Sequence, residues 1–304
     1  MAFQTNTNVK LEDFDSLWSL GDPVVVEQKF RELLPQARHL EDKSIYLQVL
    51  SQLALAQAIQ KKFDDAHKTL DEAEALLTPE YDFARARVLL ERGRVFQQAG
   101  NIPEARAYFE QSFQFSEKHK FDYHTINAAH MIAIVAEKTE EKIQWNQLAL
   151  NLATSTKDTR ARDWLGPLSN NLARNYLEEK QFEKALAMFQ KSLEYREKEG
   201  HASNIRIAKW SIAHTLRLLG LLDDALAIQH ELLKEYAAMT KSGNFDMPAV
   251  MFKVARGWVY EEIAEIYNAK ARIFASLAYD DLSNELIYTT TERLERLKHM
   301  QSKL

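Results

Sequence analysis

The 304-residue chain has no cysteine, only eight glycines and only six prolines. Without cysteine it can form no disulfide and has no thiolate nucleophile or cysteine-ligated metal site. The scarcity of glycine and proline disfavours the many tight turns of an all-β fold. Leu, Ala, Glu, Lys, Gln and Arg, which favour helix, are abundant instead. These features predict a helical protein and are consistent with a reducing compartment.

Positive charge and long apolar runs are also in short supply. The 39 Lys and Arg residues are outnumbered by 44 Asp and Glu residues, which gives a net charge of −5. A general nucleic-acid binder needs a surplus of cations to neutralise phosphates. No apolar run reaches the roughly 18 residues of a membrane span, and the first residues lack the pattern of a secretory signal. We therefore expect a cytoplasmic protein that binds neither nucleic acid nor a membrane.

Motifs for catalysis, phosphate binding and metal binding are missing as well. The glycines are isolated, so there is no glycine-rich phosphate loop, and no GxSxG motif occurs. The segment at His230 opens like the zinc-protease motif HExxH but carries Lys234 at the second ligand position. The nearest approach to a metal cluster is His119, Asp122, His124 and His130. Their spacing does not put three ligands on one helical face, so we predict a protein that is not an enzyme and has no metal or cofactor.

Pairs of small residues twelve positions apart recur along the chain. The clearest pairs are Ala54 with Ala66, Gly93 with Ala105, Ala173 with Ala185, and Ala213 with Ala225. Their spacing leaves room for one degenerate copy, whose first small residue is Ala133. Small side chains let two helices approach closely where they cross, and larger apolar residues beside them fill the remaining space. Each pair therefore predicts one antiparallel helical hairpin, with a small residue on each arm.

The residues around these pairs resemble the tetratricopeptide repeat over roughly Ser44 to Tyr236. Besides the small pair, the resemblance rests on a large apolar residue three positions after its first member and another just after the turn. In the clearest copy these residues are Tyr176 and Phe182. The resemblance implies an all-α superhelix, a solenoid of stacked antiparallel hairpins with capping helices at both ends. The period of about 40 residues exceeds the roughly 34 usual for the family, so we expect taller hairpins.

The repeats suggest a division of the chain into three segments of one continuous solenoid domain. N-terminal capping helices that form a degenerate repeat, five tetratricopeptide-like repeats, and a C-terminal extension are predicted at residues 1–40, 41–240 and 241–304. In the first segment, Asp22 is a natural N-cap for a helix that begins at Pro23. The same region, Leu17 to Ala37, resembles bacterial cytoplasmic repeat proteins.

The C-terminal extension departs from the repeat period. It is predicted to hold a loop, a divergent hairpin with Ala264 and Ser276 on its arms, and a polar closing helix. A capping-box pattern of Thr289 and Glu292 marks the start of that helix. The loop Lys241–Met247 is either a mobile gate or a spacer, and we favour the spacer.

The first helix of each hairpin lines the concave face of such a stack, and these helices carry Arg, Asn and His although the chain is acidic. Arginine and asparagine can hold a carboxylate or an extended peptide backbone through directed hydrogen bonds, and a tryptophan can supply an apolar anchor. Exposed helix faces also carry such residues merely as solvated surface. The predicted peptide-binding groove consists of Arg87, Arg94, Gln97, Asn127, His130, Asn170, Asn171, Arg174, Trp210, His214 and Arg217.

The predicted function is a non-catalytic adaptor or scaffold whose groove binds an acidic or carboxylate-bearing segment of another protein. Two alternatives stay open. One is an intracellular sensor of a peptide signal, and the other is a structural protein that self-assembles into a homo-oligomer through its exposed ends. The N-terminal 40 residues are too short and too acidic to be a DNA-binding output domain, which disfavours the sensor.

Overall fold

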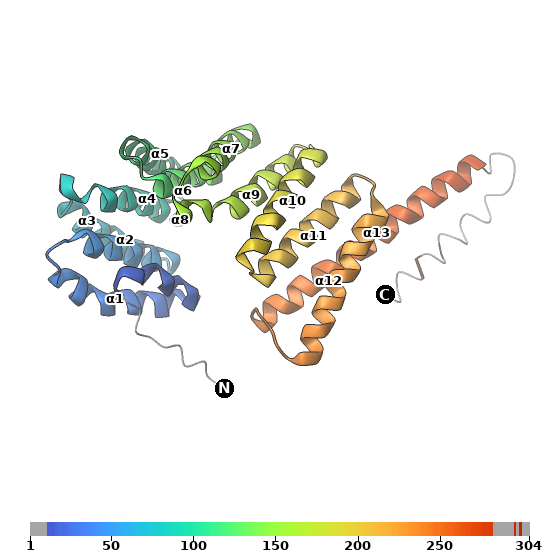
Figure 1. The fold of residues 1–304 in the computed structure, drawn as a ribbon, viewed down its shortest axis with the longest axis horizontal. Coiled ribbons are helices and arrows are strands. Elements are labelled where there is room, and N and C mark those ends of the chain that lie inside the picture. The colour runs from blue at the N-terminus through green and yellow to red at the C-terminus, as the bar shows by residue number, and fades with distance from the viewer. Residues whose placement is uncertain (1–10, 282–294, 296–297, 300–304) are drawn as a thin grey trace. The chain divides into compact units, whose positions relative to one another are not determined.

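The computed structural model describes residues 11–281, 295, 298 and 299 (Figure 1). These residues form α-helices and two 3-10 helices, and no β-strand occurs among them. The all-α prediction is therefore confirmed. The chain divides between Trp164 and Leu165 into two compact units, called unit 1 and unit 2 below. The prediction of one continuous domain in three segments stays a prediction.

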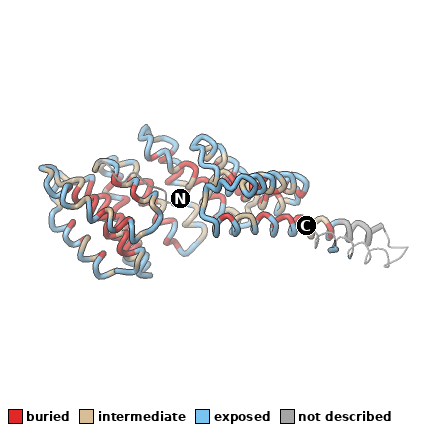
Figure 2. The backbone as a smooth tube through the Cα atoms, turned by 90° about the horizontal axis from the view of Figure 1, so that it is seen from below, coloured by how far each residue is buried: buried red, intermediate tan, exposed pale blue. Residues whose placement is uncertain are grey.

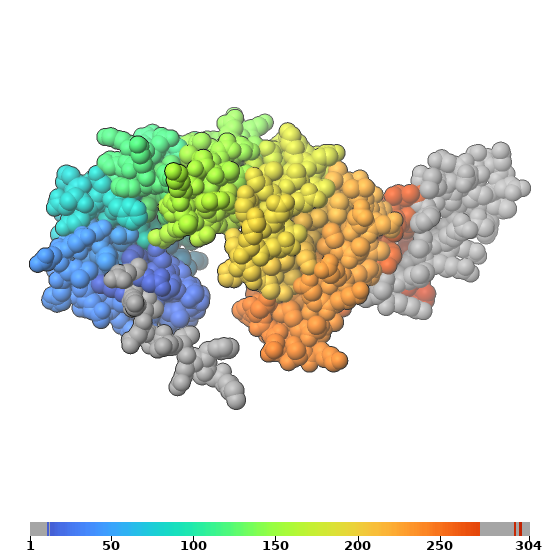
Figure 3. All heavy atoms as spheres, in the orientation of Figure 1, coloured from blue at the N-terminus to red at the C-terminus, as the bar shows by residue number. Residues whose placement is uncertain are grey.

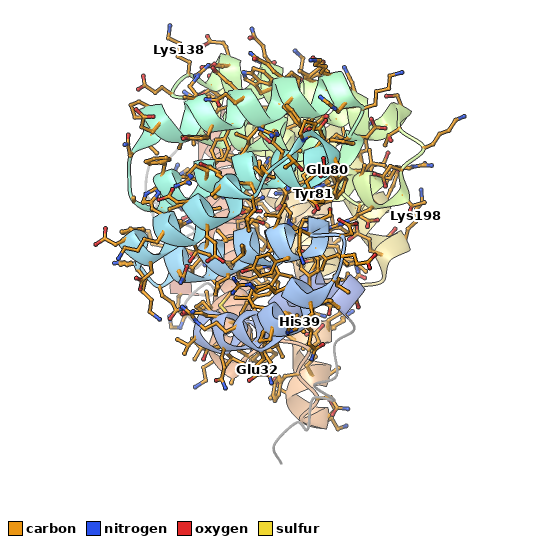
Figure 4. All side chains as sticks on the ribbon, turned by 90° about the vertical axis from the view of Figure 1, so that its left-hand side faces the viewer. Glu32, His39, Glu80, Tyr81, Lys138 and Lys198 are labelled. Carbon is orange, nitrogen blue, oxygen red and sulfur yellow. The ribbon has the colours of Figure 1, made fainter. Side chains whose placement is uncertain are left out.

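Unit 1 consists of two N-terminal helices, three antiparallel helix pairs and two short connecting helices. The N-terminal helices are η1 (Leu11–Leu20) and α1 (Pro23–His39). The pairs are α2 (Ser44–Ile59) with α3 (Phe63–Ala75), α4 (Asp82–Gln98) with α5 (Ile102–His119), and α6 (Asp122–Val135) with α7 (Thr139–Ser155). The short helices are η2 (Pro79–Tyr81) and α8 (Thr159–Arg162). Figure 4 shows these helices in successive layers, from α1 near Glu32 to the turn at Lys138.

Unit 2 consists of two antiparallel helix pairs and one long helix. The elements are α9 (Leu165–Glu178) with α10 (Phe182–Glu199), α11 (Ala202–Leu218) with α12 (Leu222–Ser242), and α13 (Ala249–Asp281). The second helices of the pairs, such as α3 and α5, bury one side, whereas α2 and α6 are buried around most of their circumference (buried residues red in Figure 2). The first pattern is expected of amphipathic helices at the surface, and the second of helices enclosed by their neighbours.

The small residues lie where the two helices of a pair cross. The seven alanines of the four clearest pairs have no exposed surface. At Gly93 the approach is closest, since a Cβ added there would lie 2.5 Å from ring carbons of Phe109. Each of these four pairs therefore sits on the two arms of one hairpin.

The same backbone turn joins the helices in these four pairs. One residue at each turn has a positive φ, and these residues are Lys61, Gly100, Lys180 and Gly220. The following N–H donates to the carbonyl five residues earlier, as from Asn101 to Phe96 at 2.9 Å, which closes the end of the first helix. Two of these residues are glycine and two are lysine. The left-handed conformation costs a lysine about 1 kcal/mol of conformational free energy. Because lysine is not a residue typical of such turns, its presence in the sequence does not predict one.

The start of α1 is as predicted. The Asp22 carboxylate accepts a hydrogen bond of 2.9 Å from the N–H of Val24, and Pro23 is the first residue of the helix. An N-cap side chain of this kind satisfies a backbone donor that the helix itself leaves unpaired.

The predicted hairpin after Tyr260 was wrong, because α13 continues without a turn from Ala249 to Asp281. The residues between Ala264 and Ser276 include no glycine or proline to end the helix. Two small residues twelve apart are thus not sufficient for a hairpin. The predicted closing helix at Thr289 lies outside the described residues.

The loop between α12 and α13 is anchored to the rest of unit 2. The Arg206 guanidinium donates to both carboxylate oxygens of Asp246 at 2.5 and 2.6 Å. The ring of Phe245 lies 4.8 Å from the ring of Phe252. These contacts support the spacer interpretation of the loop over the gate.

Replacing Gly257 by alanine is expected to raise the free energy of unfolding of unit 2 by about 0.5–1 kcal/mol, since alanine is the better helix former. Gly257 lies inside α13, and a Cβ added there would meet no atom within 4 Å. Urea unfolding followed by circular dichroism measures the change. A loss of stability would contradict the exposed helical position.

Candidate binding sites on the first helices

Two hollows lie on the first helices of the repeats, one in each unit. The unit-1 pocket has a volume of about 280 Å³ and involves α2, α4 and α6. The unit-2 pocket has a volume of about 590 Å³ and is built around α9, α11 and α13. A volume of this second size lies within the range of typical ligand pockets.

The walls of the unit-2 pocket are mostly apolar and aromatic. The rings of Trp210 on α11 and Trp258 on α13 lie 6.3 Å apart, and the Trp210 indole N–H donates to the carbonyl of Trp258 at 3.2 Å. The Trp210 ring also stacks on His214 at 5.2 Å. Trp258 keeps 46% of its surface exposed. A large aromatic surface therefore faces solvent where a ligand could cover it.

Glu262 of α13, whose carboxylate is buried, is one of the residues that line this pocket. It accepts hydrogen bonds from Arg217 at 2.5 Å and from His214 at 2.9 Å, and only 4% of it is exposed. Burial raises the pKa of Glu262, but the hydrogen bonds from His214 and Arg217 outweigh it and the pKa is lowered overall. Glu262 is therefore ionised near neutral pH and neutralises Arg217.

The remaining cations of the unit-2 pocket differ in their partners. Arg206 is held by Asp246, as described above. Arg174 is exposed, and in the part of the chain that the structure describes it forms no ion pair. Asn170 lies one helical turn before Arg174 on α9, so the two side chains share a face. On the α13 side, Glu261 and Glu265 are exposed.

The centre of the unit-1 pocket is an acidic side chain between two arginines. The Asp15 carboxylate of η1 pairs with both terminal nitrogens of Arg87 from α4 and accepts a 2.5 Å hydrogen bond from Arg160 of α8. The Arg160 guanidinium also lies 4.2 Å from the centre of the Tyr123 ring. Burial raises the pKa of Asp15, but the charges and hydrogen bonds of Arg87 and Arg160 lower it overall. The carboxylate is therefore ionised.

A second chain of hydrogen bonds lies beside it. Glu91, which is 2% exposed, accepts from Gln52 at 2.9 Å and from Arg94 at 3.2 Å. Arg94 also donates to Asn127 at 2.8 Å, and Gln52 accepts from the Trp18 indole at 2.7 Å. The three arginines of the unit-1 pocket are thus held by groups of the same unit.

The comparisons with known proteins agree with this architecture. A profile of the tetratricopeptide repeat matches residues 169–199, which hold the end of α9 and all of α10. The fold is similar to solved structures of BtubC (BKLC) from P. vanneervenii and of a signal transduction ATPase with numerous domains from Pyrococcus horikoshii, which has a tetratricopeptide repeat sensor. The chain therefore contains a match to the tetratricopeptide repeat at residues 169–199, within a fold that is similar to tetratricopeptide-repeat structures.

The structural matches are distant in sequence. BtubC is 17% identical with a TM-score of 0.59, and the match covers 79% of this chain and 96% of that one. The Pyrococcus ATPase is 15% identical with a TM-score of 0.61, and the match covers 96% of this chain and 46% of that one. The apo form of RapI is 13% identical, with a TM-score of 0.53 and coverages of 86% and 97%. At these identities the likeness shows the fold alone, and no curated protein sequence matches the chain.

Most predicted groove residues line one of the two pockets. Those in the unit-1 pocket are Arg87, Arg94 and Asn127, and those in the unit-2 pocket are Asn170, Arg174, Trp210, His214 and Arg217. The predicted residues outside both pockets are Gln97, His130 and Asn171. Peptide binding by any of these residues stays a prediction.

Several pocket residues were not predicted from the sequence because they do not lie on the first helices of the hairpins. These are Asp15 and Trp18 of η1, Arg160 of α8, and Trp258 and Glu262 of α13. A repeat pattern contains no information about segments that flank the repeats. Arg206 lies on a first helix, α11, but was not among the predicted groove residues.

The histidines considered as metal ligands lie in separate surroundings. His119 pairs with Asp82 at 3.2 Å. His124 packs on the ring of Phe83 at 4.7 Å, and His130 on the ring of Trp164 at 5.1 Å. Among the described residues, no three His, Asp or Glu side chains come together as metal ligands. Over the same residues no helix is long and apolar enough to cross a membrane.

Proposed function

We propose that this protein is a non-catalytic adaptor that binds a segment of another protein in the unit-2 pocket. The observation that carries the proposal is the combination of apolar surface with an arginine that forms no ion pair among the described residues. Trp210 and Trp258 offer aromatic surface, while Arg174 and Asn170 lie on the same face of α9. Such a pocket suits a large apolar side chain next to a carboxylate.

The charges of the pocket favour one carboxylate over an acidic run. Arg217 and Arg206 are already neutralised by Glu262 and Asp246. Arg174 is the cation left to meet a ligand among the described lining residues, and the exposed Glu261 and Glu265 would repel further negative charge. The ligand we propose is therefore an apolar or aromatic segment with a single carboxylate.

The repeat architecture supports a binding role of this kind. The Pyrococcus horikoshii ATPase with a similar fold uses its tetratricopeptide repeats as a sensor. Stacked repeats present an extended concave surface that recognises a partner without rearranging the backbone.

Co-purification from cell lysate with mass spectrometry tests the proposal. The variant combines Arg174→Glu with Trp258→Ala, two exposed positions where the fold should survive. The control is Lys198→Glu, an equal charge change at an exposed residue of α10, labelled in Figure 4. Partners captured by the wild type and the control but lost from the variant support the pocket. Partners retained by all three proteins, or captured by none, contradict it.

A further inference from the structure

The 3-10 helix η1 packs on α1 and α2, and Asp15 and Trp18 of this helix line the unit-1 pocket. Phe14 and Leu17 of η1 are 5% and 3% exposed, and they join a buried cluster with Val49 and Leu53 of α2. Figure 3 shows this segment, in dark blue, against the surface of unit 1. The chain's own N-terminal segment therefore covers a face that first helices otherwise offer to a ligand.

The polar contacts of η1 go beyond those of an apolar cap. Arg87 of α4 is 6% exposed, and its guanidinium lies 5.0 Å from the centre of the Phe14 ring while it pairs with Asp15. Arg160, which is 145 residues further along the chain than Asp15, approaches the same carboxylate from the other side. An apolar cap needs no carboxylate held between two cations from separate helices.

The charge count of the pocket shows what this carboxylate does. The lining carries three arginines, Arg87, Arg94 and Arg160, and two carboxylates, those of Asp15 and Glu91. Glu91 is engaged by Arg94. Without Asp15, the buried Arg87 and the neighbouring Arg160 would face each other without a counter-charge. A buried cation without a partner is costly, so this face requires an acidic group.

We propose that the unit-1 pocket is a docking site for acidic segments that carry an aromatic residue beside the carboxylate, and that residues 14–18 of the chain occupy it as an internal competitor. The partner's aromatic ring takes the place of Phe14 on Val49 and Leu53, and its carboxylate takes the place of Asp15 between Arg87 and Arg160. This site is separate from the unit-2 pocket and does not depend on the function proposed for it. A tethered competitor acts at an effective concentration of order millimolar, so an outside segment binds well only when η1 is displaced.

Fluorescence anisotropy with a labelled decapeptide, LEDFDSLWSL, tests the proposal on the full-length chain. Asp15→Lys places a cation against Arg87 and Arg160 and expels the tethered segment. Asp13→Lys is the matched control, because Asp13 is exposed on the same segment and makes no ion pair among the described residues. We expect the peptide to bind the Asp15→Lys variant about tenfold or more tightly than the control or the wild type.

Two further measurements separate docking from a structural role. A peptide with asparagine in place of its second aspartate should bind the Asp15→Lys variant no more tightly than it binds the wild-type protein. Arg160→Gln, added to Asp15→Lys, should weaken peptide binding, and its half-exposed side chain makes loss of the fold unexpected. If Asp15→Lys does not fold, Asp15→Asn against Asp13→Asn repeats the comparison at constant side-chain size.

Hydrogen exchange of residues 11–20 reports whether the segment has left. Equal peptide affinity in both variants, with the segment released only from Asp15→Lys, would overturn the proposal and leave η1 as a cap. A segment that stays protected in Asp15→Lys, or a peptide that binds equally with asparagine, would overturn it too. The Arg174→Glu change in unit 2 should leave all of these affinities unchanged.

Discussion

Replacing Phe109 by alanine is expected to lower the free energy of unfolding of unit 1 by about 3–5 kcal/mol. Phe109 has no exposed surface, and its ring lies against the backbone of Gly93 where α4 and α5 cross. The substitution leaves a cavity between two helices that are held apart by the rest of the repeat. Guanidinium unfolding followed by circular dichroism measures the loss. A loss below about 1 kcal/mol would mean that the pair can collapse onto the cavity.

The partner residue gives this prediction a sharper form. Gly93→Ala alone should cost about 1–3 kcal/mol, although alanine is the better helix former, because its Cβ would lie 2.5 Å from the Phe109 ring. In the Phe109→Ala background the ring contact is gone and the 3.1 Å approach to the Ala105 carbonyl oxygen remains, so the same substitution should cost less than it does in the wild type. A double-mutant cycle measures this coupling between the two residues. Simple additivity would show that the two residues do not meet.

Lowering the pH from 7 to 5 is expected to destabilise unit 1 by about 2 kcal/mol through His124 alone. Burial, followed by the charges of Arg87 and Arg160, lowers the pKa of His124 from 6.5 to about 3, and Arg94 acts in the same direction while Asp15 opposes it. Between these two pKa values the unfolded chain binds the proton and the folded chain does not. Stability therefore falls as the pH drops from about 7 towards 3.

His124→Leu is the variant that isolates this effect, because it removes the titratable imidazole and fills the same space with an apolar side chain. Unfolding measured at pH 7 and pH 5 should show a smaller difference for the variant than for the wild type. Burial also lowers the pKa of His130 to about 4, so part of the dependence should remain. Carboxylates with a lowered pKa, such as that of Glu262, reduce the stability of the protein only when the pH falls below their ordinary pKa of 4.5. An unchanged pH dependence in the variant would contradict the buried, neutral state of His124.

The hairpins could be predicted from the sequence because each one depends on contacts within about 30 residues. Ala173 and Ala185 mark a single crossing point, and a pattern repeated four times is hard to produce by chance. The same logic failed after Tyr260, where Ala264 and Ser276 have the spacing but lie on one continuous helix. The spacing indicates a hairpin only when residues between the two arms can end the first helix.

Most predicted groove residues lie at one of the two pockets, but their hydrogen-bond and charge partners could not be predicted. Arg94 and Arg174 each directly follow the first small residue of a pair. Arg94 is held by Glu91 and Asn127, while Arg174 has no ion pair among the described residues. Charge partners decide which arginine can receive a ligand. Those partners depend on how whole helices stack, which the local pattern does not contain.

The sequence by itself determined the helical class, the tetratricopeptide hairpins and the cap at Asp22, because short-range geometry and propensity decide each of them. Only the tertiary structure decided that α13 completes the unit-2 pocket and that Asp15 sits between Arg87 and Arg160. The physical reason is distance along the chain. A pairing across 72 or 145 residues follows from the stacking of many helices, and no local pattern of residues specifies it.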